Sequence, residues 1–136
     1  MTTSDIHIIQ KSWRLLENVD RSQLGATFYN KLFTDHPGLR KMFPADMSLQ
    51  YQKLIDMLHT IVIDLQEGTI MGAPIIAMGQ RHVIYGVKPF HYRMVGAALL
   101  WMLQQELKHY FTKEVKLAWS ACYEEVAEAM QQTTEH

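Results

Sequence analysis

The sequence has few of the residues that several specialised folds require. Its 136 residues include one cysteine, four prolines and seven glycines. Cys122 has no partner for a disulfide within the chain and cannot form a cysteine-rich metal site. No apolar run reaches the roughly 18 residues of a membrane span, and the start MTTSDIHIIQ lacks the basic and apolar regions of a secretory leader. We therefore expect a cytoplasmic protein without disulfides.

The charge of the chain is nearly balanced. Thirteen Lys and Arg residues stand against 14 Asp and Glu residues, which gives a formal net charge of −1. Proteins that bind nucleic acids or anionic membranes generally carry an excess of basic residues, so neither is expected as a partner. The length and the hydrophobic fraction of 48% are typical of one compact domain, expected to span residues 1–136.

The four prolines separate segments in which apolar residues recur every three to four positions, and no strict alternation predicts a strand. The fold class expected is therefore all-α. The first helix is expected to follow Ser4 as its N-cap. Its apolar residues are Ile6, Ile9, Trp13 and Leu16. A second helix is expected over residues 21–36, followed by a helical turn that begins at Pro37 and ends near Pro44.

The next helix, with Asp46 or Ser48 as its cap, has the clearest apolar stripe of the chain. The stripe consists of Leu54, Leu58, Ile61, Val62 and Leu65, and Gln50 lies one turn earlier on the same face. We expect a break over residues 68–74 and then a segment, ending at Gly86, with Ile75, Met78 and His82 on one face. Two more helices are expected, from Pro89 to about residue 108 and after a Thr112 cap. The inward face of the last helix comprises Val115, Ala118, Trp119, Cys122, Val126 and Met130.

Three polar side chains occupy positions where helical spacing predicts apolar ones: Tyr29, Gln50 and His82. Burying such a group without a partner costs about 1–3 kcal/mol, so each is expected to have one. A single histidine on an apolar face is more often a hydrogen-bonded core residue than a metal ligand. These three residues, taken alone, do not establish a cofactor.

A resemblance to a known family adds to this pattern. Residues 80–100, QRHVIYGVKPFHYRMVGAALL, resemble the proximal region of neuroglobins, flavohaemoglobin globin domains and single-domain bacterial haemoglobins. Further similar segments follow the family's order: FYNKLF at 28–33, KMFP at 41–44, QYQKL at 50–54 and AWSACY at 118–123. The resemblance implies a globin fold, all-α, with about seven to eight helices that sandwich a haem.

The resemblance also implies the residues that contact the haem. His82 would be the axial iron ligand through Nε2, with its Nδ1–H directed at a backbone carbonyl, expected to be that of Met78. Phe43 would pack on the haem face, although core packing would equally explain a phenylalanine there. Lys53 and Arg81 would either reach a haem propionate or remain solvated. The other contacts implied are Leu54, Tyr92, Val95 and Leu99. Without a CxxCH motif the haem, of the b type, would be bound non-covalently.

On the opposite side of the haem, Tyr29, Gln50 and Leu54 match the positions that face a bound gas. Hydroxyl and amide donors stabilise the negative charge of bound oxygen more than they stabilise carbon monoxide, which implies tight oxygen binding. Because glutamine is a poor iron ligand, the ferrous iron is expected to be five-coordinate. His59 lies off this stripe and is expected to be a surface or hydrogen-bonded residue. The remaining histidines are expected at the surface: His7, His36, His91, His109 and His136.

The function implied is oxygen binding, with conversion of nitric oxide to nitrate by electrons from a separate reductase. The alternative is oxygen delivery or gas sensing without turnover; a globin that has lost haem is disfavoured because the key residues are retained together. Flavohaemoglobins also pair a tyrosine, matched by Tyr92, with a glutamate. Thr134 stands at the glutamate position, with Glu128 and Glu135 out of register, which argues against strong electron donation to the ligand. We expect a monomer or weak homodimer, with O2, NO and CO as ligands.

Overall fold

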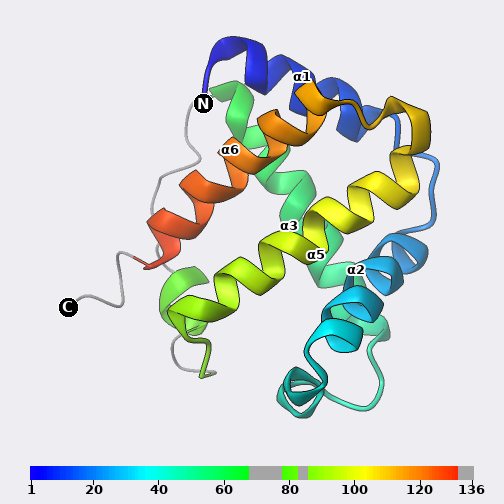
Figure 1. Cartoon of the computed structure of the whole chain (residues 1–136), viewed down its shortest axis with the longest axis vertical. Coiled ribbons are helices and arrows are strands. Elements are labelled where there is room, and N and C mark those ends of the chain that lie inside the picture. Colours follow the sequence, from blue (N-terminus) through cyan, green and yellow to red (C-terminus); the bar gives the residue numbers. More distant parts are fainter. Residues whose placement is uncertain (68–77, 83–85, 132–136) are drawn as a thin grey trace.

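A computed structural model describes residues 1–67, 78–82 and 86–131, all of whose regular structure is helical (Figure 1). The α-helices are α1 (Thr3–Arg14), α2 (Arg21–Asp35), α3 (Ser48–Glu67), α5 (Pro89–Leu107) and α6 (Lys113–Gln131). Two 3₁₀ helices, η1 (Pro37–Met42) and η2 (Lys108–Tyr110), join them, and residues 78–82 are also helical. The all-α prediction is confirmed. The break expected over residues 68–74, and Ile75, lie outside the described residues.

The start of α1 differs from the prediction. Its N-cap is Thr2, not Ser4: the Thr2 hydroxyl accepts the Asp5 N–H at 3.0 Å, and the Asp5 carboxylate accepts the Thr2 N–H at 2.9 Å. Each of these two residues accepts the backbone N–H of the other, so two backbone donors are satisfied. A cap at Ser4 would leave both donors unpaired, because the arrangement requires an acidic residue three positions after the cap. The helix also ends at Arg14, so Leu16 lies in the following turn, although it is buried as predicted.

The other helix boundaries follow the expected local signals. Of the two candidate caps for α3, Asp46 makes the bond, and its Oδ1 accepts the Ser48 N–H at 3.0 Å. Thr112 caps α6 as predicted, since its hydroxyl accepts the Val115 N–H at 3.2 Å. Pro89 is the first residue of α5, where the missing N–H of proline costs no helical hydrogen bond. The predicted bounds of α2, η1 and α5 are each within about two residues of those observed.

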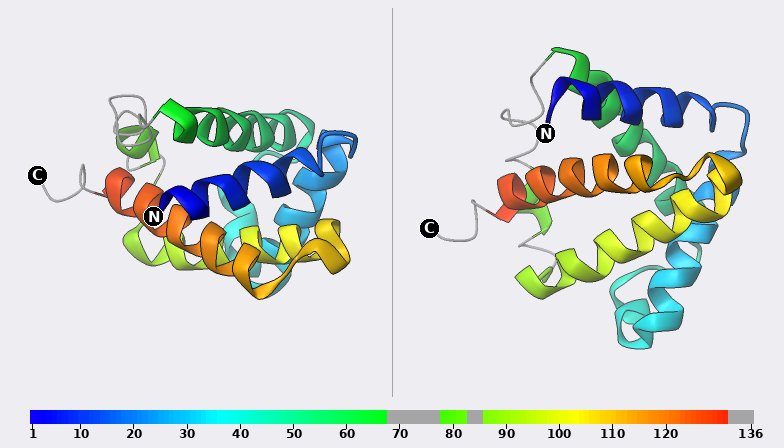
Figure 2. Two further views of the ribbon diagram at one scale, coloured as in Figure 1. Left: turned by 90° about the horizontal axis from the view of Figure 1, so that it is seen from above. Right: turned by 45° about the horizontal axis from the view of Figure 1, so that its top comes forward.

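The helices form one core. The helix α2 packs across both α3 and α5, while α1 packs against α6 and α3 and lies between them in Figure 2. Every member of the predicted α3 stripe is buried. The predicted inward face of α6 is also buried, apart from Val115, which is half-buried. No helix among the described residues is long and apolar enough to cross a membrane.

The helices α2 and α3 cross in direct contact. A Cβ added at Gly25 would lie 2.5 Å from the Cβ of Tyr51, closer than two such atoms can approach. Glycine at this position therefore lets the two backbones meet. Tyr29 lies one turn beyond Gly25 on α2, and Gln50 directly precedes Tyr51 on α3. The crossing thus brings two of the three predicted polar residues side by side.

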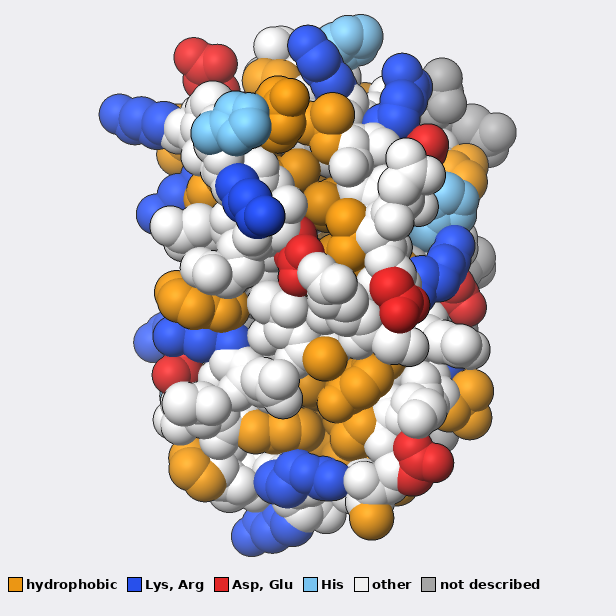
Figure 3. Space-filling model, turned by 90° about the vertical axis from the view of Figure 1, so that its right-hand side faces the viewer, with side chains coloured by type: hydrophobic (Ala, Val, Ile, Leu, Met, Phe, Trp, Pro, Cys, Tyr) orange, Lys and Arg blue, Asp and Glu red, His pale blue; other side chains and the backbone are white. Residues whose placement is uncertain are grey.

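The molecular surface agrees with the balanced composition. The face shown in Figure 3 carries Lys and Arg side chains mixed with Asp and Glu, without a continuous area of one sign. A surface that follows a phosphate backbone would need such an area. The face shown in Figure 3 therefore has no basic surface for a nucleic-acid backbone.

Candidate functional site

His82 is half-buried at the end of the helical segment 78–82. Its Nδ1 lies 2.7 Å from the carbonyl oxygen of Met78, which confirms the contact predicted from the sequence. A carbonyl oxygen only accepts hydrogen bonds, so Nδ1 carries the proton and Nε2 keeps its lone pair. Gly79 allows this segment to lie against α6, since a Cβ there would be 2.2 Å from the oxygen of Met130. The imidazole is therefore held with a metal-binding nitrogen available.

Tyr29 and Gln50 form a hydrogen-bonded pair. The amide Nε2 of Gln50 donates to the Tyr29 hydroxyl oxygen at 3.0 Å, and only 5% of Tyr29 is exposed. Because Tyr29 is the acceptor in this bond, its own hydroxyl proton is left for a further partner. Burial raises the pKa of Tyr29, and the bond from Gln50 offsets part of that rise. The hydroxyl therefore remains a donor at neutral pH.

Aromatic rings surround Tyr29 on several sides. The ring centroids lie at 4.8 Å for Phe28, 5.4 Å for Phe43, 5.7 Å for Phe33 and 5.8 Å for Tyr51. Phe43 was predicted as a site residue, whereas Phe33 and Tyr51 were not. Phe33 could have been found from its position one turn after Tyr29, on the same face of α2. These four rings restrict the orientations that the Tyr29 side chain can adopt.

The turn that carries Phe43 is held by a single arginine. The guanidinium of Arg40 donates to the carbonyl oxygens of Phe43, Pro44 and Ala45 at 3.3, 2.9 and 3.0 Å. It also lies 5.4 Å from the centroid of Phe33, a cation–π distance. Arg40 therefore fixes a non-helical segment that has few backbone hydrogen bonds of its own. Sequence reasoning did not identify it.

Tyr92, on α5, has a buried hydroxyl that finds no hydrogen-bond partner within the described ranges of the chain. Burial raises the pKa of this group, so it stays protonated. An unpartnered buried hydroxyl costs about 1–3 kcal/mol, which favours a further polar partner for this group. The apolar residues predicted with it, Leu54 and Leu99, are buried, and Val95 is half-buried.

The other predicted contacts are placed less specifically. Lys53 and Arg81 are both exposed, which fits a propionate contact and a solvated side chain equally. Glu128 is exposed on α6, while Thr134 and Glu135 lie outside the described residues. The glutamate position of flavohaemoglobins is therefore not described.

Two of the histidines expected at the surface are partly buried instead. His91 is half-buried because its Nδ1 accepts the Lys88 N–H at 2.8 Å at the start of α5. His36 is half-buried because it occupies the tight junction between α2 and η1. His7 and His109 are exposed as predicted, and His136 lies outside the described residues.

His59 is hydrogen-bonded, as predicted. Its Nδ1 accepts a hydrogen bond from Trp13 Nε1 at 3.2 Å. Since Trp13 lies on α1 and His59 on α3, this bond joins the two helices. His59 is therefore bonded to Trp13 and does not belong to the Tyr29–Gln50 pair.

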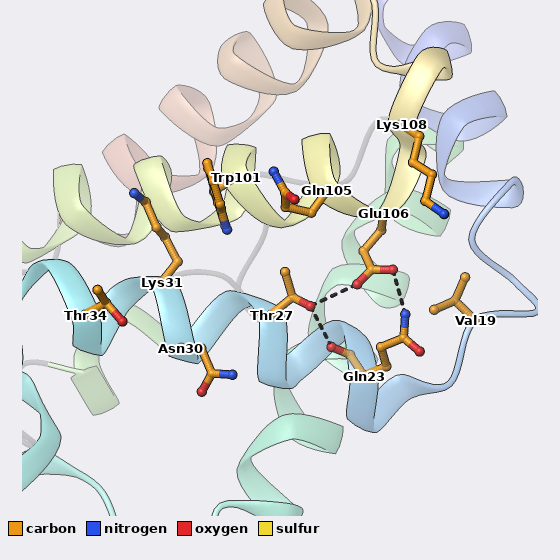
Figure 4. A pocket seen from close by; sticks show the side chains of 10 residues that line it. All are labelled: Val19, Gln23, Thr27, Asn30, Lys31, Thr34, Trp101, Gln105, Glu106 and Lys108. Carbon is orange, nitrogen blue, oxygen red and sulfur yellow. Dashed lines mark hydrogen bonds between the residues drawn. The ribbon is translucent and has the colours of Figure 1, made fainter.

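A separate hollow of about 710 Å³ lies between α2 and α5 (Figure 4). None of the predicted site residues lines it. Its polar side chains bond to one another: both carboxylate oxygens of Glu106 accept hydrogen bonds, from Gln23 Nε2 and the Thr27 hydroxyl, each at 2.9 Å. The hollow is therefore formed by a different set of residues from the predicted site.

His82 suits a haem better than a free metal ion. Within the described part of the chain no three His, Cys, Asp or Glu side chains gather as a metal site would require. An iron with one protein ligand must bring its other ligands with it, as a porphyrin does. The free Nε2 of His82, the buried hydroxyl of Tyr92 and the apolar Leu54 and Leu99 fit such a group. These features are compatible with the class of all-helical proteins that bind haem.

Comparison with known proteins identifies the family. The Globin family profile matches residues 26–130, so the chain belongs to the globin family. Membership implies haem binding. A solved structure shares the fold of this chain, with a TM-score of 0.86 at 21% identity. That structure is an engineered carbene transferase made from a provisionally assigned nitric oxide dioxygenase of Rhodothermus marinus, and the match covers 99% of this chain and 94% of the other.

Two relatives are similar along most of the chain. The flavohemoprotein of Bacillus subtilis is 28% identical over 130 residues, which cover 91% of this chain and 32% of the flavohemoprotein. Neuroglobin-2 of Oncorhynchus mykiss is 27% identical over 144 residues, which cover 96% of this chain and 90% of the neuroglobin. The chain thus spans about a third of the flavohemoprotein but most of the neuroglobin.

Proposed function

We propose that this globin binds oxygen on a non-covalent haem b held by His82, and that it converts nitric oxide to nitrate with electrons from a separate reductase. The observation that carries the proposal is the Tyr29–Gln50 pair, in which the buried Tyr29 hydroxyl accepts from Gln50 and donates to no acceptor among the described residues. The similarity to a flavohemoprotein supports the direction of the chemistry. This similarity covers 32% of the length of the flavohemoprotein.

Bound haem supplies an iron position for a diatomic gas and a path for one electron. His82 would hold the iron through Nε2, while its bond to the Met78 carbonyl fixes the orientation of the ring. Leu54 and Leu99 would contact the apolar faces of the porphyrin and exclude water. The hydroxyl of Tyr92 would donate to a polar atom on the His82 side.

Tyr29 would donate a hydrogen bond from its hydroxyl to the oxygen molecule, because Gln50 already donates to the hydroxyl oxygen. Gln50 therefore has a positioning role, and the surrounding rings keep the hydroxyl from turning away. Such a bond favours oxygen, which draws negative charge, over carbon monoxide. We expect slow oxygen release. We also expect a five-coordinate ferrous iron, since an amide is a poor ligand for iron.

The overall reaction proposed is NO + O2 + e⁻ → NO3⁻. Every atom of the nitrate comes from the two gases, so the chain needs no catalytic acid or base. Its residues bind oxygen, retain it until nitric oxide arrives and limit access of water. The electron for each cycle comes from the reductase.

The test measures nitrate formed by the haem-loaded protein with oxygen, nitric oxide, NADH and a generic flavin reductase. We expect many nitrate molecules per haem, with oxygen dissociating over seconds. His82→Ala should lose haem uptake and turnover, whereas the control His59→Ala should retain both. One nitrate per haem together with rapid oxygen release would overturn the proposal and favour oxygen delivery. A six-coordinate ferrous spectrum would contradict the expected coordination.

A further inference from the structure

Charge is distributed unevenly along the chain. The ranges 36–53, 78–82 and 86–93 contain six of the 13 Lys and Arg residues but one of the 14 Asp and Glu residues, Asp46, which gives a net charge of +5. The rest of the chain has seven basic and 13 acidic residues, a net charge of −6. The formal charge of −1 is therefore the sum of two parts of opposite sign. The six basic residues are Arg40, Lys41, Lys53, Arg81, Lys88 and Arg93.

The same three ranges carry residues proposed to surround the haem. Phe43 and Gln50 belong to the first range, His82 to the second and Tyr92 to the third. In Figure 1 and in the right-hand view of Figure 2, η1 and the start of α5 lie in the lower part of the molecule, whereas α1 lies along its top. The six basic residues therefore mark the end of the molecule that would hold the haem, called the basic end below.

The positive charges of the basic end are available to a partner. Five of the six side chains are exposed, and Arg40 is half-buried. The ion pairs of the described residues involve none of the six. The bonds that Arg40 makes go to carbonyl oxygens, which carry no formal charge, so its positive charge is not cancelled.

Exposed apolar side chains lie on the same ranges. The exposed fractions are 63% for Leu49, 58% for Phe90 and 37% for Met42. Interfaces between proteins combine apolar side chains at the centre with charged and polar residues around them. A small inorganic anion would use the charges but not these apolar groups. The composition of the basic end therefore fits a protein partner with an acidic surface.

We propose that the basic end docks the protein that delivers the electron, a flavoprotein whose flavin is surrounded by Asp and Glu side chains. The inference rests on the proposed function, because only a reaction that consumes electrons needs such a donor. In the step itself one electron passes from the reduced flavin of the partner to the ferric haem, and no bond forms or breaks. Opposite charges increase the rate of encounter by about 10- to 1,000-fold. The net negative charge of the rest of the chain repels an acidic partner that approaches from another side.

The docking is tested with flavodoxin, an acidic flavoprotein that donates single electrons, as the probe. Oxidised flavodoxin is titrated into the haem-loaded ferric protein and the heat of binding is measured. We expect binding at an ionic strength of about 10 mM that weakens at least fivefold at about 100 mM, because the screening length falls from about 30 Å to about 10 Å. No binding at the lower ionic strength, or binding that does not depend on salt, would overturn the proposal.

A matched pair of double variants locates the binding. Lys41→Glu with Lys88→Glu changes the basic end, whereas Lys113→Glu with Lys116→Glu changes exposed positions at the start of α6. Each double variant changes the formal net charge from −1 to −5, so a difference between them reflects position alone. At low ionic strength the first should weaken flavodoxin binding, and slow haem reduction by reduced flavodoxin, at least tenfold. The second should change both by less than threefold, and equal effects would overturn the proposal.

Two further measurements separate docking from other causes. Reduction by photoreduced riboflavin, which has no phosphate and no protein surface, should have the same rate in both double variants. If the first double variant does not take up haem, Arg93→Glu compared with Lys116→Glu gives the same test with one charge reversed. Binding of vesicles of phosphatidylcholine and phosphatidylserine, without binding of flavodoxin, would overturn the proposal in favour of a membrane surface.

Failure of the docking and failure of the proposed function give different results. Binding and haem reduction are measured without nitric oxide, so they do not depend on nitrate formation. If both depend on the basic end but no nitrate forms, the proposed function fails and the docking site stands. If reduced flavodoxin supports equal nitrate turnover in the two double variants, the proposed function stands and the docking site fails.

Discussion

The hydroxyl of Tyr29 is the group whose removal tests the proposed gas chemistry most directly. Tyr29→Phe deletes one oxygen atom and keeps the ring, so the packing against Phe28, Phe33 and Phe43 is preserved. With 5% of the side chain exposed, water has little access to replace the lost donor. We expect the oxygen dissociation rate to increase while haem uptake is unchanged.

The size of the increase follows from the type of bond. A hydrogen bond to a charged acceptor contributes about 1.5–3 kcal/mol, and about 1.4 kcal/mol corresponds to a tenfold change. The increase should therefore be between about 10- and 150-fold. The amide of Gln50, which loses its acceptor in this variant, can turn toward the ligand. This places the expected value near the lower end of the range.

The assay is stopped-flow displacement of oxygen by carbon monoxide, with carbon monoxide dissociation measured in parallel. The matched control is Tyr51→Phe, which removes the same atom from the neighbouring tyrosine ring, 5.8 Å away. Carbon monoxide release should change by less than about threefold in either variant, because this ligand gains less from a donor. Equal oxygen release in the two variants would refute the assignment of Tyr29.

Two further predictions concern stability. Gly25→Ala should lower the free energy of unfolding by about 1–3 kcal/mol, because the new Cβ would lie 2.8 Å from the Cα of Tyr51 in the α3 backbone. The control Gly38→Ala should change the free energy of unfolding by less than about 0.5 kcal/mol, because a Cβ there would have no atom within 4 Å. Urea unfolding measures both, and equal effects would contradict the crossing contact. The pKa of His91 is lowered from 6.5 by burial and then by the charge of Lys88, so its stabilising contribution is present above pH 6.5 and lost as the pH falls. The free energy of unfolding should therefore decrease more between pH 7 and pH 5 in the unaltered protein than in His91→Ala. The control His7→Ala should behave like the unaltered protein. Identical pH profiles for all three proteins would exclude this role of His91.

The fold was predictable because it depends on periodicity and local signals. The stripe from Leu54 to Leu65 and the Thr112 cap involve residues within a few turns of one another. The contact between His82 and Met78 could also be predicted, since it joins residues four apart on one helix. What the residues alone did not provide was the haem, which entered through the resemblance to globins.

Features that depend on tertiary contacts were missed. Arg40 bonds three carbonyls of a turn whose shape no periodicity predicts. The bond between Trp13 and His59 spans 46 positions of sequence, so only its existence, and not its partner, could be expected. The predicted Ser4 cap is wrong because Thr2 forms a reciprocal contact with Asp5, which a single cap signal does not reveal.

The crossing at Gly25 has a consequence for redesign of the protein. Because the spacing of α2 and α3 there is set by main-chain atoms, substitutions on either flank can reshape the neighbouring spaces without changing the distance between the two helices. Under the proposed function, variation at such flanking positions would alter which gas is retained and for how long, while the architecture stays constant. Replacement of the glycine itself would disturb both flanks at once.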